Sequence, residues 1–262
     1  MEQEAKPIVE QAAITIGSYG MPDFVRLCIR ATRREFGSAP IIVSDDLSES
    51  SAMVEAVCRD EEVCYTGSDR RRSHCSGDWQ TFLVAGAWAR KCKRRIAVKL
   101  SQRFIPLQGC ADLLLSPFTS RDVDVVYPPM MDPRNAVRPS TVFYSKFNVL
   151  TDCLAWSTEA ISEDHLLAHY RARVLTSDDK NNGLVEFAWD KLIKERFSDR
   201  AVAVDELANP VPLQQKKYLR KASALDAEYR RVAEELGVQG VFDTREWVAI
   251  EGHRYMRSGT IV

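Results

Sequence analysis

Two strand-like segments with a helix-like segment between them lie near the N-terminus, and this arrangement restricts the fold more than any other feature. Residues 13–17 (AITIG) and 41–43 (IIV) are short, largely apolar runs of strand length. Between them, apolar residues recur at i, i+3, i+4 and i+7, namely at Phe24, Leu27, Cys28 and Ala31. That spacing gives a helix one apolar face that can cover a sheet. The pattern predicts a βαβ unit with parallel strands and a right-handed crossover.

A ligand is expected at the carboxyl ends of these two strands, because open α/β sheets bind ligands in the crevice outside those ends. The residues found there are Gly17, Ser18, Tyr19, Asp45 and Asp46. Adjacent aspartate side chains point in different directions, so one can contact a ligand while the other caps the next helix. We expect ligand contact by one of the two aspartates. The alternative is that both only cap and turn.

The composition narrows the range of functions. With 262 residues, 45% of them apolar, the chain can bury a full core, and we expect a single unit. The 36 basic residues balance 37 acidic ones, so no overall charge favours nucleic acid or a membrane surface. The N-terminus is charged and no apolar run approaches the roughly 18 residues of a membrane span, so we expect a soluble, cytoplasmic protein. Seven scattered cysteines without C-x-x-C spacing indicate reduced thiols.

The rest of the chain continues to alternate between strand-like and helix-like segments. Further strands are predicted at residues 63–65, 96–100 and 123–127, and a strand of edge character at 140–150. Further helices are predicted at 48–57, from a cap at Asp78 into 89–95, and at 163–173, 184–197 and 218–236. This order predicts an α/β fold with a mostly parallel central sheet flanked by helices and a helical C-terminal region.

The order of segments over about residues 12–130 resembles the GT-A nucleotide-sugar glycosyltransferases, especially the family 2 type. The resemblance rests on a strand ending in a small turn, a second strand ending in V-S-D-D (43–46), a loop with G-D (77–78), a helix with a small-residue face, and the strand IAVKL (96–100). It implies one GT-A-like domain, with a nucleotide-binding half at 12–130 and an acceptor half with the helical C-terminal region at 131–262. It also implies a donor site for base and ribose at Ile16, Gly17, Ser18, Tyr19, Asp45 and Asp46.

One departure from the family bears on the chemistry. The family usually ends the strand matching IAVKL with an Asp-x-Asp that binds a divalent cation on the sugar diphosphate. Here the position holds Lys99, Leu100, Ser101, Gln102 and Arg103, without a carboxylate. If a diphosphate binds, Lys99 and Arg103 would neutralise it directly, so the enzyme would be metal-independent and need no cofactor. Asp122 and Asp124 also spell D-V-D, but they precede a strand, and a plain role at the strand start is expected.

Further donor contacts are predicted in the loop before the third helix. Arg70, Arg71, Arg72 and His74 precede Gly77 and Asp78, and basic residues before a helix N-terminus attract anions. The alternatives are a solvated basic face and a pure capping role for Asp78. The resemblance implies contact between Asp78 and the base or donor, and Ser101 belongs to the same expected site.

The resemblance implies transfer of a sugar from a nucleotide-sugar donor to a glycan or lipid-linked acceptor, as in polysaccharide biosynthesis. An inverting transfer needs a base that takes the proton of the acceptor hydroxyl. Asp152, in the expected acidic loop TDCLAW (151–156), is the first candidate for this base, and Glu186 is the second. A retaining enzyme needs no such base, and the sequence does not decide between them.

Other roles for this chain stay open. One alternative is a sugar nucleotidyltransferase, although the glycine-rich loop with a lysine that such enzymes carry after the first strand is missing. Another is a non-catalytic nucleotide- or glycan-binding module with a degenerate site. Trp156, Trp189 and Tyr144 are expected either to stack on sugars or to pack in the core. The basic run 216–221 suggests at most peripheral membrane contact, with a solvated face favoured.

Overall fold

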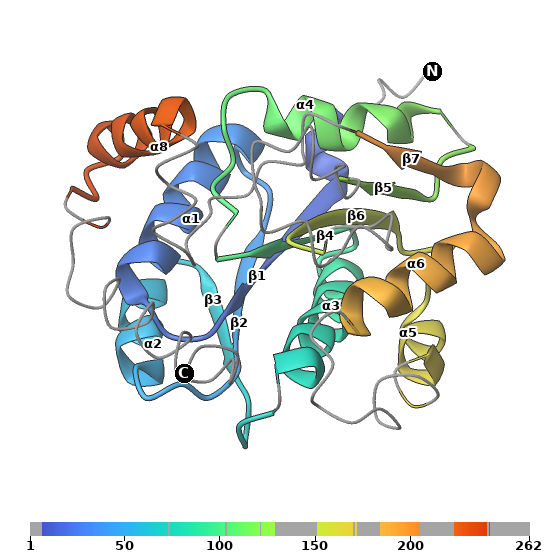
Figure 1. Cartoon of the computed structure of the whole chain (residues 1–262), viewed down its shortest axis with the longest axis horizontal. Coiled ribbons are helices and arrows are strands. Elements are labelled where there is room, and N and C mark those ends of the chain that lie inside the picture. The colour runs from blue at the N-terminus through green and yellow to red at the C-terminus, as the bar shows by residue number, and fades with distance from the viewer. Residues whose placement is uncertain are drawn as a thin grey trace, which may run out of the picture.

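The computed structural model describes residues 7–72, 74–102, 104–120, 122–128, 151–169, 171, 184–204, 223–239 and 241. They form one seven-stranded sheet in the order β3-β2-β1-β4-β6-β5-β7 (Figure 1). Its strands are β1 (Ala12–Ser18), β2 (Ile41–Asp45), β3 (Cys64–Gly67), β4 (Ile96–Ser101), β5 (Val125–Tyr127), β6 (Cys153–Ser157) and β7 (Ala201–Ala203).

Helices cover both faces of the sheet (Figure 1). The α-helices are α1 (Pro22–Phe36), α2 (Ser51–Asp60), α3 (His74–Lys91), α4 (Cys110–Leu115), α5 (Glu163–His169), α6 (Leu184–Arg196) and α8 (Ser223–Glu235), and short 3₁₀ turns lie at Ile8–Gln11, Ser116–Thr119 and Ser198–Arg200. Because side chains alternate along β1, Ile14 and Ile16 pack with α1, α2, α4 and α8, whereas Ala13 packs with α3, α5 and α6. The predicted α/β class, a largely parallel sheet between helices, is confirmed.

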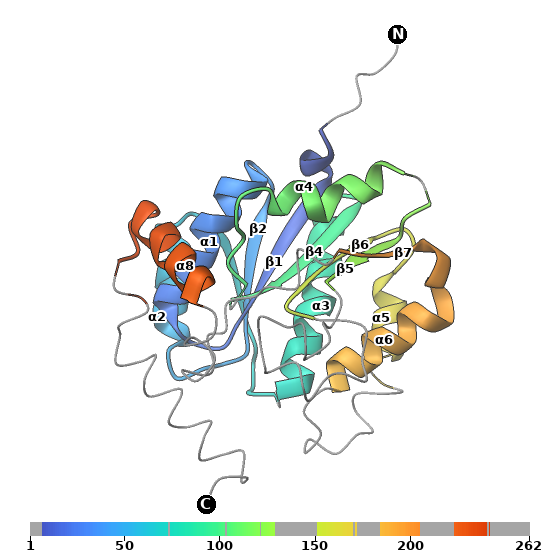
Figure 2. The ribbon, with the colours of Figure 1, turned by 45° about the horizontal axis from the view of Figure 1, so that its top comes forward.

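The first half of the sheet is parallel, as the βαβ pattern predicts. β1 lies between β2 and β4 and pairs with both in parallel, with Gly17 opposite Ser44 on one side and Ser101 on the other. β3 extends the parallel arrangement beyond β2. The carboxyl ends of β1–β4 therefore lie at one edge of the sheet, which we call the carboxyl edge. The N-terminal end of α3 lies at the same edge (Figure 2).

The second half of the sheet differs from the prediction. Residues 153–157, expected in a loop, form β6, which runs antiparallel to β4 and β5. β7 and α4 were not predicted, and β7 places a strand within the C-terminal region that was expected to be helical. Helix bounds also shift, because α2 begins at Ser51 and α3 at His74. The predicted strand at 140–150 lies outside the described residues.

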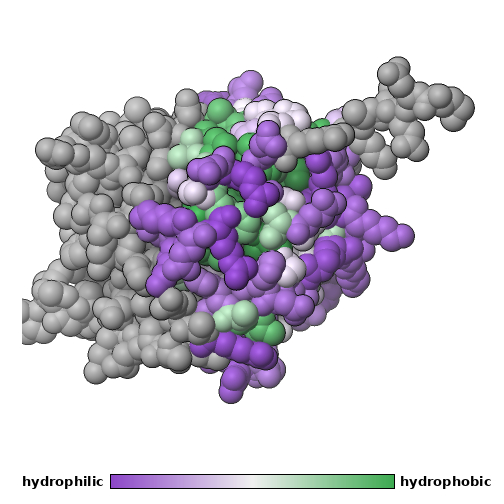
Figure 3. Space-filling view, turned by 90° about the vertical axis from the view of Figure 1, so that its right-hand side faces the viewer, coloured by the Kyte–Doolittle hydropathy of each residue, from purple (hydrophilic) through white to green (hydrophobic). Residues whose placement is uncertain are grey.

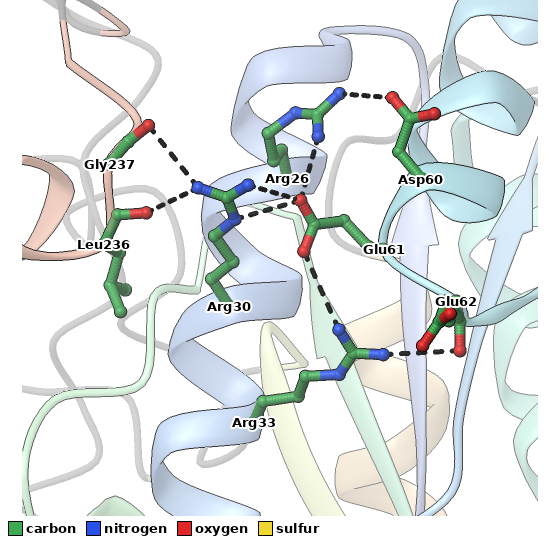
Figure 4. A network of polar contacts seen from close by, with 8 residues as sticks. All are labelled: Arg26, Arg30, Arg33, Asp60, Glu61, Glu62, Leu236 and Gly237. Carbon is green, nitrogen blue, oxygen red and sulfur yellow. Dashed lines mark hydrogen bonds and ion pairs between the residues drawn. The ribbon is translucent and has the colours of Figure 1, made fainter.

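Arg30 of α1 links the end of the C-terminal helix α8 to a buried acidic residue that follows α2 (Figure 4). The side chain of Glu61 is only 8% exposed, and its carboxylate lies 2.9 Å from Arg26 and 2.8 Å from Arg30. Arg30 also donates to the backbone carbonyl of Leu236 at 2.7 Å, just after α8. Burial alone would raise the pKa of Glu61, but the hydrogen bonds from Arg30 and Arg26 hold it below the usual value. This network joins α8 to the βαβ unit despite their separation in sequence.

The face of the molecule on the side of α6 and β7 is mainly polar among the described residues, and smaller apolar areas lie between its charged side chains (Figure 3). Among the described residues, the large apolar side chains that are exposed are Tyr19, Leu47, Met53 and Leu113. Tyr19 and Leu47 follow β1 and β2 directly, so both lie at the carboxyl edge. No described helix combines the length and the apolar character needed to cross a membrane.

Candidate functional site

The carboxyl edge is shaped by two glycines that let α3 approach the strands closely. A side chain at Gly17 of β1 would meet Thr81 of α3 at 3.0 Å, and one at Gly77 would overlap the carboxylate of Asp46. Both glycines therefore permit contacts that a larger residue would block. As a result, the first turns of α3 lie directly against the ends of β1 and β2.

Tyr19 presents an exposed aromatic ring at this edge. Its side chain is 43% exposed, and the guanidinium carbon of Arg71 lies 4.9 Å from the ring centroid. Its backbone N–H donates to Oε1 of the buried Gln102 at 2.9 Å, which fixes the turn after β1 to the end of β4. An aromatic ring beside a cation suits a flat, anionic ligand. Sequence analysis did not single out Gln102 as a site residue, although a polar residue directly after a buried strand was the available signal.

The structure does not support the expected contact between Asp45 and a ligand. It is 1% exposed, and its carboxylate accepts hydrogen bonds from the backbone N–H groups of Gly20 and Ser48, both at 3.4 Å. It also accepts from the Ser51 hydroxyl. Asp45 therefore holds the turns after β1 and β2 together and does not face a ligand. Ser18 is likewise buried, and its hydroxyl donates to the carbonyl of Gly20 at 3.4 Å.

Asp46 is the member of the acidic pair that reaches the carboxyl edge. Its Oδ1 accepts the backbone N–H of Arg72 at 3.1 Å, and its own N–H donates to the Ser18 carbonyl at 3.1 Å. Burial raises the pKa of Asp46, with the nearby Arg72 acting in the opposite direction. A half-buried carboxylate of this kind can accept hydrogen bonds from the hydroxyls of a sugar.

Part of the basic loop after β3 forms one wall of a hollow. Arg72 donates to the Ser68 hydroxyl at 2.5 Å and pairs with Asp69 at 3.3 Å, while Arg70 and Arg71 are exposed. The hollow, of about 290 Å³, is lined by Ser44, Thr66, Gly67, Ser68, Asp69, Arg72, Gln80 and Val84. Arg70 and Arg71 are thus the described cations of this loop that remain open to an anionic ligand.

Lys99 was expected to be an exposed cation at the end of β4, but the structure shows that it is buried. It is 1% exposed, and its Nζ lies 2.5 Å from Oδ1 of Asp78 and 2.8 Å from the Thr151 carbonyl. Its positive charge is therefore already balanced inside the protein, and a diphosphate cannot reach it in this arrangement. Asp78 lies inside α3, four residues after the helix begins at His74, so the expected capping role is also wrong.

The residues that end β4 do not fit a divalent cation. Magnesium and manganese prefer several oxygen ligands, above all carboxylates. Here Lys99 brings an ammonium group, Ser101 is buried, and the amide oxygen of Gln102 already accepts from Tyr19. Across the part of the chain that the structure describes, no group of three or more His, Cys, Asp or Glu side chains is arranged to hold a metal.

Asp152, the first candidate for the catalytic base, lies at the same edge. Its carbonyl accepts the Ser101 N–H at 2.7 Å, and the next residue, Cys153, is the register partner of Leu100. Its role as a base stays a prediction. Arg103 and the side chains of His74 and Glu186 lie outside the described residues, as do Tyr144 and residues 216–221.

Two further expectations concern residues that lie away from the carboxyl edge. Trp156 and Trp189 are fully buried and pack against each other and Phe82, so the core reading is correct and sugar stacking by either is excluded. Asp124 precedes β5, where it pairs with Arg200 at 2.7 Å. It therefore has the plain role at a strand start that was expected.

Solved structures similar to this chain share its fold. Glucosyl-3-phosphoglycerate synthase from Mycobacterium tuberculosis in complex with phosphoglyceric acid superposes with a TM-score of 0.52 at 14% identity, covering 92% of this chain and 86% of that one. The same enzyme with UDP, Mn²⁺ and glucosyl-3-phosphoglycerate gives a TM-score of 0.50 at 15% identity, with the same coverage. A cytidylyltransferase from Leptospira borgpetersenii is a more distant match, with a TM-score of 0.43 at 10% identity over 74% of this chain and 76% of that one.

Comparisons of sequence alone find no match for this chain. No protein-family model matches the chain, and no curated protein sequence matches it. The likeness therefore concerns the fold, which combines a largely parallel sheet, helices on both faces and the antiparallel strand β6 beside β4. On this basis the chain has a GT-A-like fold.

Proposed function

We propose that this protein is a glycosyltransferase that takes a sugar from a nucleotide-sugar donor. The observation that carries the proposal is the exposed Tyr19 ring with Arg71 beside it, held at the carboxyl edge by Gln102. A nucleobase stacks on an aromatic face, and the phosphates that follow it attract exposed guanidinium groups. Open α/β sheets bind nucleotides at this edge.

Each described group at the edge has a role in this proposal. Tyr19 stacks on the base, Asp46 accepts hydrogen bonds from the ribose hydroxyls, and Arg70 and Arg71 neutralise the diphosphate. The glucosyl-3-phosphoglycerate synthase structures with UDP support a nucleotide in this fold. Arg103 stays a predicted contact of the diphosphate.

Transfer without a metal is part of the proposal. Its support is the end of β4, where an ammonium, a buried hydroxyl and an engaged amide replace the carboxylates of the family. In the related enzyme the crystals contain Mn²⁺ together with UDP. In this chain arginine side chains would supply the positive charge directly, because guanidinium groups bind phosphate oxygens in bidentate fashion.

Asp152 is the proposed base for an inverting transfer. It would take the proton of the acceptor hydroxyl while the oxygen of that hydroxyl bonds to the anomeric carbon and the bond to the diphosphate breaks. Its support is its position beside Ser101 at the carboxyl edge. A glycan or lipid-linked acceptor, a role in polysaccharide biosynthesis and a cytoplasmic location remain proposals carried by the resemblance.

Calorimetric titration of the full chain with UDP, GDP, CDP and CMP, each with and without Mn²⁺, tests the proposal. We expect one diphosphate to bind and Mn²⁺ to leave its affinity unchanged. Absence of binding by all four would overturn the function, whereas binding that requires Mn²⁺ would overturn only the metal-independent part. Release of free sugar from the matching donor would then distinguish an enzyme from a non-catalytic binding module, the alternative that the missing Asp-x-Asp supports.

A further inference from the structure

The ion pair of Lys99 and Asp78 lies between three separate parts of the chain. Lys99 belongs to β4, Asp78 to α3, and the carbonyl that accepts the second Lys99 hydrogen bond belongs to Thr151, just before β6. The Phe82 ring of α3 covers the ammonium group, with 4.8 Å between Nζ and the ring centroid. Lys99 is almost wholly buried, whereas the side chain of Asp78 keeps 25% of its surface exposed. The pair therefore connects the interior to the carboxyl edge.

The segment held by Lys99 is the one that carries Asp152. The Thr151 carbonyl binds Lys99, and the Asp152 carbonyl accepts the Ser101 N–H at 2.7 Å. Two consecutive carbonyls are thus bound by β4, one through a side chain and one through the backbone. Beyond Asp152, β6 is already fixed by its pairing with β4, with Leu100 opposite Cys153. Lys99 therefore extends the attachment of this segment to β4 by one residue beyond the strand ladder.

Stability alone does not explain a buried charge pair here. Replacing such a pair by apolar side chains of similar size is often neutral or even stabilising, because the two charges lose their hydration on burial. An apolar residue at position 99 would continue the pattern of its strand neighbours Ala97 and Val98. What a cationic side chain provides, and an apolar one does not, is a directed bond to the Asp78 carboxylate and to the Thr151 carbonyl at the same time.

We propose that Lys99 is a positioning residue, which with Asp78 forms a clamp that fixes Thr151–Asp152 against the N-terminal part of α3. Its catalytic consequence rests on the proposed function, in which Asp152 is the base. The clamp replaces the direct contact between Lys99 and the diphosphate that sequence analysis predicts. Its loss therefore lowers the rate of transfer and leaves the affinity for the nucleotide unchanged.

The double variant Lys99→Met with Asp78→Asn tests the clamp, because both side chains keep nearly the same shape and neither leaves an unpaired buried charge. Amide hydrogen exchange gives a readout independent of activity. We expect exchange at the Ser101 N–H to accelerate by about tenfold or more, since a tenfold change corresponds to about 1.4 kcal/mol of local opening. The Gln102 N–H, which donates to the Gly17 carbonyl at 2.9 Å, serves as an internal control and should not change.

Lys194→Met is the matched control variant. Lys194 pairs with Asp190 at 2.7 Å within α6, so the same substitution removes an ion pair outside the clamp, at a lysine whose side chain is 55% exposed where that of Lys99 is 1% exposed. This variant should leave exchange at Ser101 and sugar release from the donor unchanged, while the double variant loses about tenfold in sugar release at an unaltered Kd for the nucleotide. Rescue of sugar release in Lys99→Arg would show that a directed cation is what matters.

Several results would overturn the clamp. Equal acceleration of exchange at Ser101 and Gln102 would show that the pair only stabilises the fold. A weaker Kd for the nucleotide in the double variant would show that Lys99 or Asp78 contacts the donor, so that the pair is part of the binding site and not a clamp. Unchanged exchange at Ser101 would also reject the clamp. If the unmodified protein binds no nucleotide, the proposed function fails, but the exchange measurement still decides whether the clamp exists.

Discussion

At the scale of single residues, the aspartates at the carboxyl edge differ in the groups that surround them. Asp45 and Asp46 are neighbours in sequence, yet Asp45 is enclosed by backbone N–H groups and a serine, whereas Asp46 reaches the edge beside Arg72. Asp78 is held by the buried Lys99. Three carboxylates of one chemical type therefore have different tasks, which are a turn, a proposed ribose contact and a clamp.

Tyr19 is the residue whose replacement should affect donor binding most. The Tyr19→Ala variant removes the exposed ring next to Arg71. Since stacking on an aromatic side chain contributes about 1–3 kcal/mol per base, we expect nucleotide affinity to fall by roughly tenfold or more. Tyr19→Phe keeps the ring and serves as the control with unchanged affinity. Calorimetry on the two variants measures this, and equal affinities for both would remove Tyr19 from the site.

At the scale of elements, the sequence predicts the segments that carry a clear apolar pattern. The apolar runs of β1, β2 and β4 and the periodic face of α1 lead to the parallel half of the sheet, which the structure confirms. β6 was missed because its apolar run at residues 153–156 is short and follows the polar residues Thr151 and Asp152, which favour a loop. The partner of Lys99 was missed because a lone lysine in an apolar strand does not reveal which carboxylate will meet it.

Gly77 tests how α3 is placed against the strands. In Gly77→Ala the added methyl group would overlap the Asp46 carboxylate, so this carboxylate must give up its hydrogen bond from the Arg72 N–H or α3 must shift. We expect a loss of about 1–3 kcal/mol in unfolding free energy, as for other overpacked sites. Gly86→Ala is the matched control in the same helix, because its methyl group would meet Glu163 and Leu166 at ordinary distances of 3.7 and 3.8 Å.

The control variant should be neutral or more stable by up to about 1 kcal/mol, because alanine favours helix over glycine. Urea unfolding of both variants measures the difference. Equal stability of the two would show that Gly77 is not needed for the close approach of α3 to Asp46.

At the scale of the whole molecule, the protein brings distant segments to one edge by two different means. The strand ladder aligns the ends of β1, β2 and β4, while charged side chains connect what the ladder does not reach. Lys99 connects α3 to the segment before β6, and Arg30 with Glu61 connects α8 to α1. Buried charges at both junctions specify which segments meet, and apolar packing supplies most of the stability.

The stability contributed by the junction of α8 and α1 should depend on pH through Glu61. Its pKa is held below the usual value in the folded protein, so the ion pairs contribute stability above the pKa of an unfolded glutamate, about 4.3, and this contribution is lost as the pH falls through the folded value. In Glu61→Gln we expect the unfolding free energy at pH 7 to drop by about 1–3 kcal/mol, since a buried acceptor of charged hydrogen bonds is lost.

The difference between Glu61→Gln and the unmodified protein should shrink toward zero as the pH falls through the lowered pKa of folded Glu61, because the protonated side chain no longer forms the ion pairs. Asp60→Asn is the matched control, because Asp60 pairs with the same Arg26 but its side chain is 60% exposed, and exposed pairs contribute about 0–1 kcal/mol. Urea unfolding from pH 3 to pH 8 measures all three proteins. A deficit that stayed constant across this range would mean that Glu61 acts through its shape rather than its charge, and that the α8 junction does not depend on ionisation.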